Sequence, residues 1–236
     1  MKYYYCMNIL FGFLVLFAFG CTETSTKSDS SKKTVNSDIQ SSKQVVASPM
    51  TTSYQSDSIT DSRDRETYGV VSIGNQTWMA ENLKYNSPGS RLNPNNTSTK
   101  YGRVYTWMAA QKACPNGWHL PSDSEWNELE INLGMLNNDT GATTWRGNHG
   151  VKMKSRSDWA EDGNGTNSSN FNVFPGGHYF EGKFNDIGYT SGYWSATGNI
   201  DNNLAWVRFI AGPIKGVNRI ESDTEKSELF CRCVKD

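Results

Sequence analysis

Apolar and polar positions divide the chain into three stretches of different character. A continuous apolar run, ILFGFLVLFAFG, fills residues 9–20 after Lys2 and is too short to span a bilayer comfortably. Residues 22–66 are rich in Ser, Thr, Lys, Asp and Gln, so they bury too little apolar surface to offset the entropy of ordering. Short alternating runs with many aromatic residues and glycines follow. We therefore predict a signal peptide over residues 1–20, a flexible tether over 21–66 and one folded domain over 67–236.

The domain opens with a pattern that predicts a β-hairpin. VVSI at residues 70–73 and TWM at 77–79 flank a Gly74-Asn75 turn. A helix is then predicted over residues 105–114, because Trp, Ala and Cys recur there at helical spacing and a proline ends the pattern.

The segment CPNGWHLPSDSEW, residues 114–126, leads from that helix through a turn and a short strand into a second helix. Ser122-x-x-Glu125 forms a capping box, so we interpret Glu125 as a capping residue rather than a catalytic acid. Gly134 suits a left-handed stop at the end of the helix. The apolar stripe of this second helix consists of Trp126, Leu129 and Leu133.

The rest of the chain alternates loops with short strand patterns. AEDGNGTNSSN, residues 160–170, is a loop, and the strands are predicted within 171–180, 192–197, 204–210 and 228–234. Two helices followed by several strands predict an α+β domain.

Charge and the N-terminus indicate the partners. The formal net charge is −1 and no Lys/Arg cluster is interleaved with aromatic residues, so nucleic acid is not an expected partner. Gly20-Cys21 after the apolar run resembles a bacterial lipoprotein signal, which implies lipidation of Cys21. The chain would then be an outer-membrane lipid-anchored protein of the cell envelope, facing the surface or the periplasm. Plain secretion and an uncleaved N-terminal anchor remain alternatives.

Six short words occur in a characteristic order: WMAENL, GRVYTWMAA, CPNGWHLPSDSEW, FPGG, YWSAT and RCVKD. Together they resemble the Fibrobacter succinogenes major paralogous domain, a family of mostly secreted or lipid-anchored bacterial proteins, over roughly residues 67–236. The helix–Cys–strand–helix layout with a cysteine in the last strand is similar, more distantly, to C-type lectin-like domains and formylglycine-generating enzymes. That likeness implies a C-type lectin-like fold, with two helices packed on short, mostly antiparallel strands, a long loop region, and paired N- and C-terminal strands.

The resemblance also bears on the cysteines. Its Arg-Cys position matches Cys233, which implies a bridge to Cys114 in the oxidising compartment that export implies. Closing a loop of this length stabilises a fold by about 4 kcal/mol in the chain-entropy model. Cys231, two positions earlier on the same strand face, can also approach Cys114, so the pairing stays open.

Catalysis by analogy with formylglycine-generating enzymes needs a copper-binding cysteine pair. The corresponding segment, residues 175–194, holds no cysteine, so Cys231 and Cys233 would have to take that role as an alternative oxidoreductase function. His119, His149 and His178 show no zinc-ligand spacing.

Ligand binding is the other class of function. The lectin motifs Glu-Pro-Asn, Gln-Pro-Asp and Trp-Asn-Asp are absent. Hard oxygen ligands for Ca²⁺ occur in one loop, at Glu161, Asp162, Asn164 and Asn167, without the spacing of a calcium loop, so a solvated turn is favoured. An exposed stacking platform for a glycan or peptide is predicted from Trp145, Trp159 and Tyr179. Core positions are predicted for Trp107, Trp118, Trp126 and Trp194.

These observations favour a cell-envelope lipoprotein that is not an enzyme. Its domain would recognise or adhere to an extracellular glycan or protein, with the membrane contacted through the N-terminal lipid. No cofactor is predicted for this function, although the 161–167 loop offers oxygen ligands for Ca²⁺.

Overall fold

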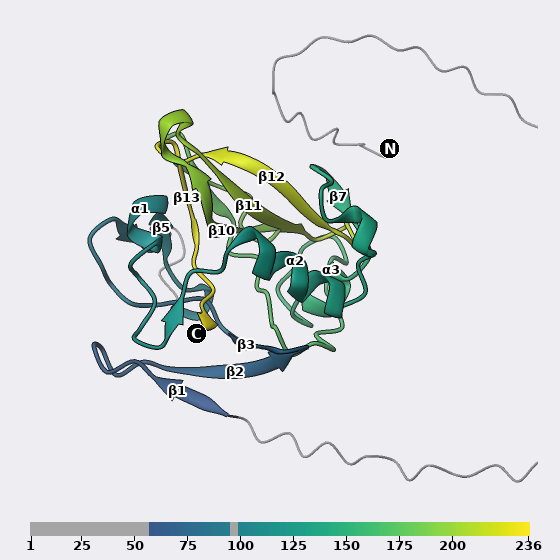
Figure 1. Ribbon diagram of the computed structural model, residues 1–236, viewed down its shortest axis with the longest axis horizontal. Helices are drawn as coiled ribbons and strands as arrows, with labels where there is room; N and C mark the ends of the chain where they lie inside the picture. Colours follow the sequence, from purple (N-terminus) through teal and green to yellow (C-terminus); the bar gives the residue numbers. More distant parts are fainter. Residues whose placement is uncertain (1–56, 95–98) are drawn as a thin grey trace, which may run out of the picture. The chain divides into compact units, whose positions relative to one another are not determined.

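The computed structural model of the chain describes residues 57–94 and 99–236 (Figure 1). The predicted signal peptide, Cys21 and most of the predicted tether lie outside the described residues. Within those residues, no helix has the length and apolar character needed to cross a bilayer. Strand β1 (Ser58–Thr60) falls inside the predicted tether and pairs with β2, so ordered structure begins before residue 67.

The smaller of two sheets joins both ends of the domain. Its strand order is β1-β2-β3-β14-β6, and all pairs are antiparallel. The bounds are β2 (Thr67–Ile73), β3 (Gln76–Met79), β6 (Trp118–His119) and β14 (Val234–Lys235). The predicted hairpin is confirmed as β2 and β3, and the implied pairing of N- and C-terminal strands is present because Val234 pairs with Trp78.

The larger sheet has nine strands, in the order β4-β5-β13-β10-β11-β12-β7, with β8 on β13 and β9 on β8. Only the β10–β13 pair is parallel among the described pairs of this sheet. Its bounds are β4 (Ser90–Arg91), β5 (Val104–Thr106), β7 (Trp145–Arg146), β8 (His178–Phe180), β9 (Lys183–Asn185), β10 (Thr190–Asn199), β11 (Leu204–Ala211), β12 (Val217–Asp223) and β13 (Ser227–Phe230).

The α+β, C-type lectin-like prediction is wrong. The described residues form two sheets in a β-sandwich-like arrangement, with short helices. The helices are α1 (Trp107–Ala110), α2 (Asp123–Asn132) and α3 (Gly150–Met153), and single 3₁₀ turns occupy Thr99–Tyr101, Asn137–Asp139 and Ile200–Asn202.

The predicted first helix is only one turn long because its neighbours take other structures. Strand β5 extends up to Thr106, whose hydroxyl caps α1. After Ala110 the chain tightens into i→i+3 hydrogen bonds, from Lys112 N–H to Ala109 O and from Ala113 N–H to Ala110 O. Several strands escaped prediction because runs of two or three residues carry no measurable alternation.

The predicted second helix is confirmed as α2. The capping box is present, with Glu125 N–H bonding Ser122 Oγ at 3.2 Å and Ser122 N–H bonding the Glu125 carboxylate at 2.7 Å. At the other end, Gly134 has φ 108°, and the N–H groups of Gly134 and Met135 bond back to Ile131 and Glu130, which is a Schellman stop.

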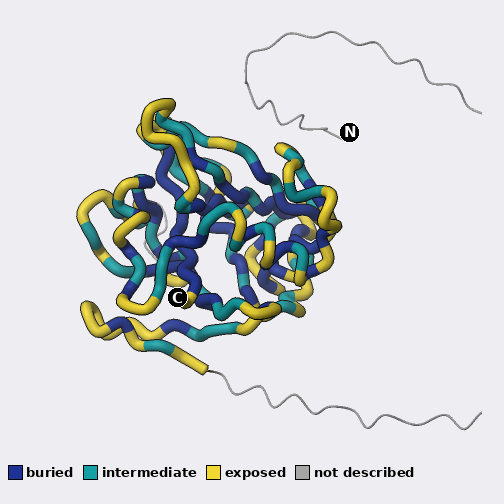
Figure 2. Tube along the Cα trace, viewed as in Figure 1, coloured by how far each residue is buried: buried dark blue, intermediate teal, exposed yellow. Residues whose placement is uncertain are grey.

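Helix α2 packs between the β2–β3 hairpin and the large sheet (Figure 1). The Trp126 ring lies 4.9 Å from that of Trp78 on β3 and 5.8 Å from that of Tyr193 on β10. Figure 2 shows the buried trace concentrated in the central strands, and the exposed trace in the outer loops and β1. Of the predicted core tryptophans, Trp107, Trp126 and Trp194 are buried, whereas Trp118 is half-buried.

Candidate functional site

The Ser122–Glu125 corner serves structure. The Glu125 carboxylate accepts hydrogen bonds from Ser122 N–H and Ser122 Oγ, and His119 Nε2 lies 2.8 Å from it. The other ring nitrogen of His119 lies 2.6 Å from the Asp236 carboxylate. Burial by itself would raise the pKa of Glu125, but the bonds from Ser122 and His119 outweigh it and lower that pKa. The Glu125 carboxylate is therefore ionised and hydrogen-bonded, which suits it to cap the helix and not to donate a proton.

The last strand was predicted within residues 228–234. In the structure this segment is divided, because residues 231–233 separate β13 from β14. Cys231 and Cys233 still face one side, and both approach Cys114 as predicted. The disulfide joins Cys114 to Cys233, and the sulfur of Cys231 lies 3.6 Å from Cys114 Sγ and 3.8 Å from Cys233 Sγ.

Cys231 is a buried free thiol whose pKa burial raises to about 12, so it is protonated and weakly nucleophilic at neutral pH. Among the described residues, these three sulfurs are the one His/Cys/Asp/Glu group with ligand atoms close enough together for a metal ion. Two of them are bonded to each other. The alternative oxidoreductase would need Cys231 and Cys233 as free, reactive thiols, which this arrangement does not supply.

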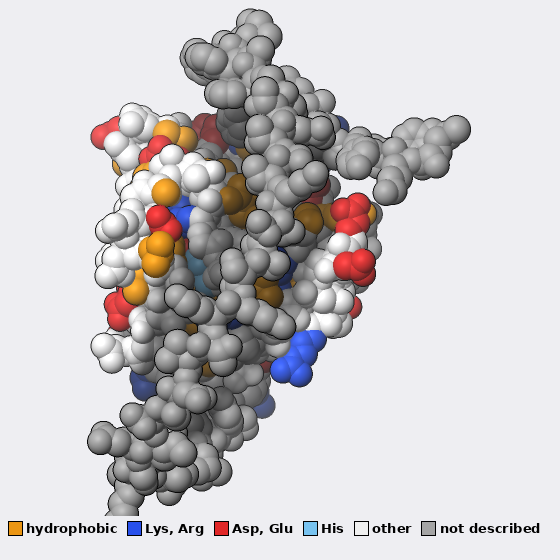
Figure 3. All heavy atoms as spheres, turned by 90° about the vertical axis from the view of Figure 1, so that its right-hand side faces the viewer, with side chains coloured by type: hydrophobic (Ala, Val, Ile, Leu, Met, Phe, Trp, Pro, Cys, Tyr) orange, Lys and Arg blue, Asp and Glu red, His pale blue; other side chains and the backbone are white. Residues whose placement is uncertain are grey.

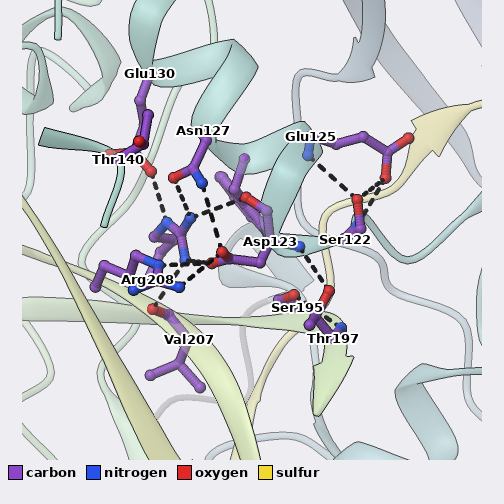
Figure 4. A network of polar contacts seen from close by, with 12 residues as sticks. Ser122, Asp123, Glu125, Asn127, Glu130, Thr140, Ser195, Thr197, Val207 and Arg208 are labelled. Carbon is purple, nitrogen blue, oxygen red and sulfur yellow. Dashed lines mark hydrogen bonds and ion pairs between the residues drawn. The ribbon is translucent and has the colours of Figure 1, made fainter. Parts of the chain in front are cut away.

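A second polar group, which we call the ionic cluster, lies between α2 and the large sheet (Figure 4). It consists of Asp123, Asn127, Glu130, Arg146, His149, Arg208 and Arg219. The fully buried Glu130 carboxylate contacts Arg208 Nε at 2.6 Å and Arg146 Nη2 at 2.7 Å.

Glu130 is the centre of this cluster. Burial alone would raise its pKa, but the hydrogen bond from His149 and the charges of Arg208 and Arg146 outweigh burial and lower the pKa to about 2. Asp123 bonds Arg208 and Arg219 from the first turn of α2. Both carboxylates and all three guanidinium groups are therefore engaged within the protein, and the cluster fastens α2 to the sheet.

The structure does not assemble the predicted stacking platform. Trp159 is 5% exposed, and its indole N–H donates to Ser155 Oγ and Val173 O. Tyr179 on β8 is half-buried beneath the Arg91 guanidinium, 4.5 Å from the ring centroid. Trp145 is half-buried on β7, at the opposite end of the large sheet. The structure therefore places these three rings in separate environments, and residue type alone does not tell which aromatic rings face the core.

The four predicted calcium ligands do not converge on one point. Asn164 Oδ1 accepts from Trp159 N–H at 3.1 Å, and Asn167 Oδ1 accepts from Asn172 N–H at 2.9 Å, so both oxygens hold the loop itself. Glu161 and Asp162 are exposed with φ of 52° and 55°. In the described part of the chain, neither belongs to a group of three close acidic, His or Cys ligands. A solvated loop, favoured above, agrees with these contacts.

A hollow of about 320 Å³, which we call the asparagine pocket, lies where segments distant in sequence meet. Its walls come from residues 80–82 after β3, from Lys100, from the 167–174 loop and from Arg232. Seven residues were predicted to bind a ligand or a metal ion, and Asn167 is the one of them that lines this pocket.

Arg232 forms the floor of the asparagine pocket and is only 1% exposed. Neighbouring residues of an extended segment point to opposite sides, so Arg232 faces away from the cysteines on either side of it. Its guanidinium donates twice to Asn82 Oδ1 and to the carbonyl oxygens of Met79 and Phe171. No carboxylate among the described residues lies within ion-pair distance of it.

Three asparagines in the loop wall share a left-handed backbone: Asn167, Asn170 and Asn172 have φ of 46°, 56° and 56°. Within the described residues, the side chain of exposed Asn170 makes no hydrogen bond, and Asn172 Nδ2 donates none. Neither residue was predicted from the sequence, although both belong to an N-x-x-N-x-N pattern within a Gly/Ser-rich loop. An arginine between two cysteines in an apolar run was the corresponding signal for Arg232.

On the face drawn in Figure 3, acidic side chains are spread out, and the visible basic side chains do not gather into one field.

Comparison with known proteins gives one match. A family model described as the Fibrobacter succinogenes major domain matches residues 71–235, which include the disulfide and the walls of the asparagine pocket. No curated protein and no solved structure matches the chain.

Proposed function

The chain belongs to the Fibrobacter succinogenes major domain family, and on this premise we propose that it is a non-catalytic recognition protein of the bacterial cell envelope. The asparagine pocket binds the ligand, and lipidated Cys21 anchors the protein to the outer membrane. The residues between the anchor and the domain hold the pocket away from the lipid surface.

One observation carries the proposal: the asparagine pocket combines a concave surface with the Asn170 amide and Asn172 Nδ2, to which no described residue forms a hydrogen bond. Ligand sites are concave and present a few convergent polar groups. The ionic cluster and the Ser122–Glu125 corner hold more charges, but their carboxylate and guanidinium groups already bond within the protein. The asparagine pocket, in contrast, has the Asn170 amide and the Nδ2 group of Asn172 to offer a ligand.

The composition of the pocket favours binding over chemistry. Its walls contain no cysteine or histidine. The one carboxylate there, Glu81, contacts Lys84 at 2.9 Å and accepts from Gly69 N–H, and these bonds, with burial opposing them, lower its pKa. A carboxylate that stays ionised and bonded is a poor general acid.

Recognition is tested by probing an array of glycans and proteins with the full-length chain carrying Cys21→Ser, which avoids lipid. We expect specific binding to at least one ligand class, weakened by Asn170→Gly. The matched control is Asn203→Gly, since Asn203 has a similar left-handed φ of 53° and lies outside the pocket. Absence of binding across the array would contradict the proposal.

The anchor is tested separately by growing bacteria that express the full-length chain with labelled palmitate. We expect label in the wild-type chain and in Cys6→Ser, whose cysteine lies within the predicted signal peptide, and none in Cys21→Ser. Unlabelled wild-type protein in the soluble fraction would overturn the lipoprotein assignment.

A further inference from the structure

We infer that the asparagine pocket binds a neutral, hydroxyl-rich ligand, namely a sugar unit of a glycan, through the amides of Asn170 and Asn172. This inference rests on the proposed recognition function and specifies its ligand class.

The charged groups around the pocket argue against an ionic ligand, because each already has a partner. Lys100 Nζ lies 2.5 Å from the Asp158 carboxylate, and Glu81 pairs with Lys84. Arg232 makes four hydrogen bonds within the protein and is buried. A charged ligand would compete with these partners for the same side chains, whereas a neutral ligand leaves every one of these bonds in place.

The available groups are amides. Asn170 offers one acceptor and two donors, and Asn172 offers the two hydrogens on Nδ2. A sugar hydroxyl both donates and accepts, so neighbouring hydroxyls of one ring can bond a side-chain amide through its oxygen and its nitrogen together. A carboxylate or phosphate can only accept when ionised, and would leave the Asn170 oxygen without a partner.

The loop is held in place before any ligand arrives. Asn167 and Asn172 bond each other twice, through Oδ1 to N–H at 2.9 Å and through Nδ2 to Oδ1 at 3.3 Å. The N–H of Asn167 also bonds Lys154 O at 3.0 Å, and the buried Lys154 ammonium bonds the carbonyl groups of Ala211, Gly212 and Ile214. Preorganised groups lose less conformational entropy on binding.

An apolar surface adjoins these amides. The Phe174 ring packs edge-to-face against Tyr101, with centroids 6.1 Å apart, and Lys100 Nζ lies 4.5 Å from its centroid. Phe174 lines the pocket and gives the C–H groups of a sugar ring an apolar contact. Amides beside an aromatic ring suit a molecule that is polar at its hydroxyls and apolar along its ring.

The test titrates the full-length Cys21→Ser chain with neutral oligosaccharides, with their uronic acid or phosphate derivatives, and with peptides, by calorimetry at low and high salt. We expect neutral sugars to bind best, with affinity insensitive to salt. Asn170→Gly and Asn172→Asp both keep residues that tolerate a left-handed backbone, so the fold is retained while amide donors are lost. Each should weaken sugar binding about tenfold, and Asn203→Gly should leave it unchanged.

The outcomes separate this inference from the proposed function. A preference for acidic sugars with strong salt dependence would overturn the neutral-ligand inference and leave recognition in place. Peptide binding that Asn170→Gly and Asn172→Asp do not affect would likewise overturn it and leave recognition in place. No binding to any sugar, derivative or peptide would contradict both.

Discussion

The ionic cluster beneath α2 and the asparagine pocket are both polar, and both contain buried arginine, yet their side chains are used in opposite ways. In the ionic cluster, Arg146 and Arg208 both donate hydrogen bonds to Glu130, and all three side chains are buried. In the pocket, the side chain of Asn170 is exposed and no described residue bonds it. The density of polar residues therefore does not locate a binding site in this domain.

Location explains the difference. An unpaired polar group between a helix and a sheet costs about 1–3 kcal/mol, and a charge costs more, so folding requires every member of the ionic cluster to find a partner. At the pocket, the exposed Asn170 amide is open to solvent, so it needs no partner within the protein. The cluster therefore contributes to stability and specificity of packing, while the pocket keeps the amide groups that we propose bind a ligand.

The largest expected effect comes from the disulfide, which ties the floor of the pocket to the end of α1. Cys114→Ala should reduce the free energy of unfolding by about 4–5 kcal/mol, because it frees a loop with a sequence separation of 119 residues. It should also weaken ligand binding, since Arg232 lies beside the released Cys233, while Cys231→Ala should retain the bridge. Urea denaturation and binding of both variants measure this. Equal stability of Cys114→Ala and wild type would show that the bridge contributes nothing.

Glu130→Ala should reduce the free energy of unfolding by about 3–5 kcal/mol, because it leaves buried Arg146 and Arg208 without their carboxylate. The control is Glu128→Ala on the same helix, whose exposed side chain has only a long 3.4 Å contact with Gln76 and should change stability by less than about 0.5 kcal/mol. Urea denaturation compares them. Similar losses of unfolding free energy in both variants would show that the ionic cluster stabilises the fold no more than the solvent-exposed surface does.

Acid should weaken the ionic cluster through Glu130. The pKa of Glu130 is about 2 in the folded protein and near its ordinary 4.5 when unfolded, so its contribution is complete above pH 4.5 and is lost as the pH falls toward 2. The loss should reach roughly 3 kcal/mol. Unfolding measured from about pH 6 to about pH 2 should show a shallower decline in Glu130→Gln. Parallel declines in the two proteins would contradict this assignment.

The smallest effect on stability is expected in the pocket. Asn170→Gly should change the free energy of unfolding by less than about 0.5 kcal/mol, because its side chain is exposed and its φ of 56° suits glycine. Thermal unfolding beside Asn203→Gly measures this. A large loss of stability in Asn170→Gly alone would make Asn170 a structural residue and would weaken the contrast drawn here.

Local rules explain which elements were predictable. The Ser122–Glu125 box and Gly134 mark both ends of α2 within a few residues of sequence, and the Gly74-Asn75 turn marks the hairpin. Helix α1 was overestimated because strand pairing of β5 overrides helical spacing up to Thr106. The final strand was predicted as continuous, but the chain leaves the large sheet after Phe230 and enters the small one at Val234.

The sequence by itself determined the elements whose signals are local: the capped helix, the hairpin, the aromatic core of Trp126 and Trp194, and the availability of Cys114 and Cys233 for a bridge. Only the tertiary structure decided which polar groups would be enclosed and which left open. Asp123 and Arg219 meet across a helix and a strand, and Asn170 and Arg232 come from a loop and the C-terminal segment. Hydrogen bonding and exclusion of water depend on distances in space, which residue spacing along the chain does not specify.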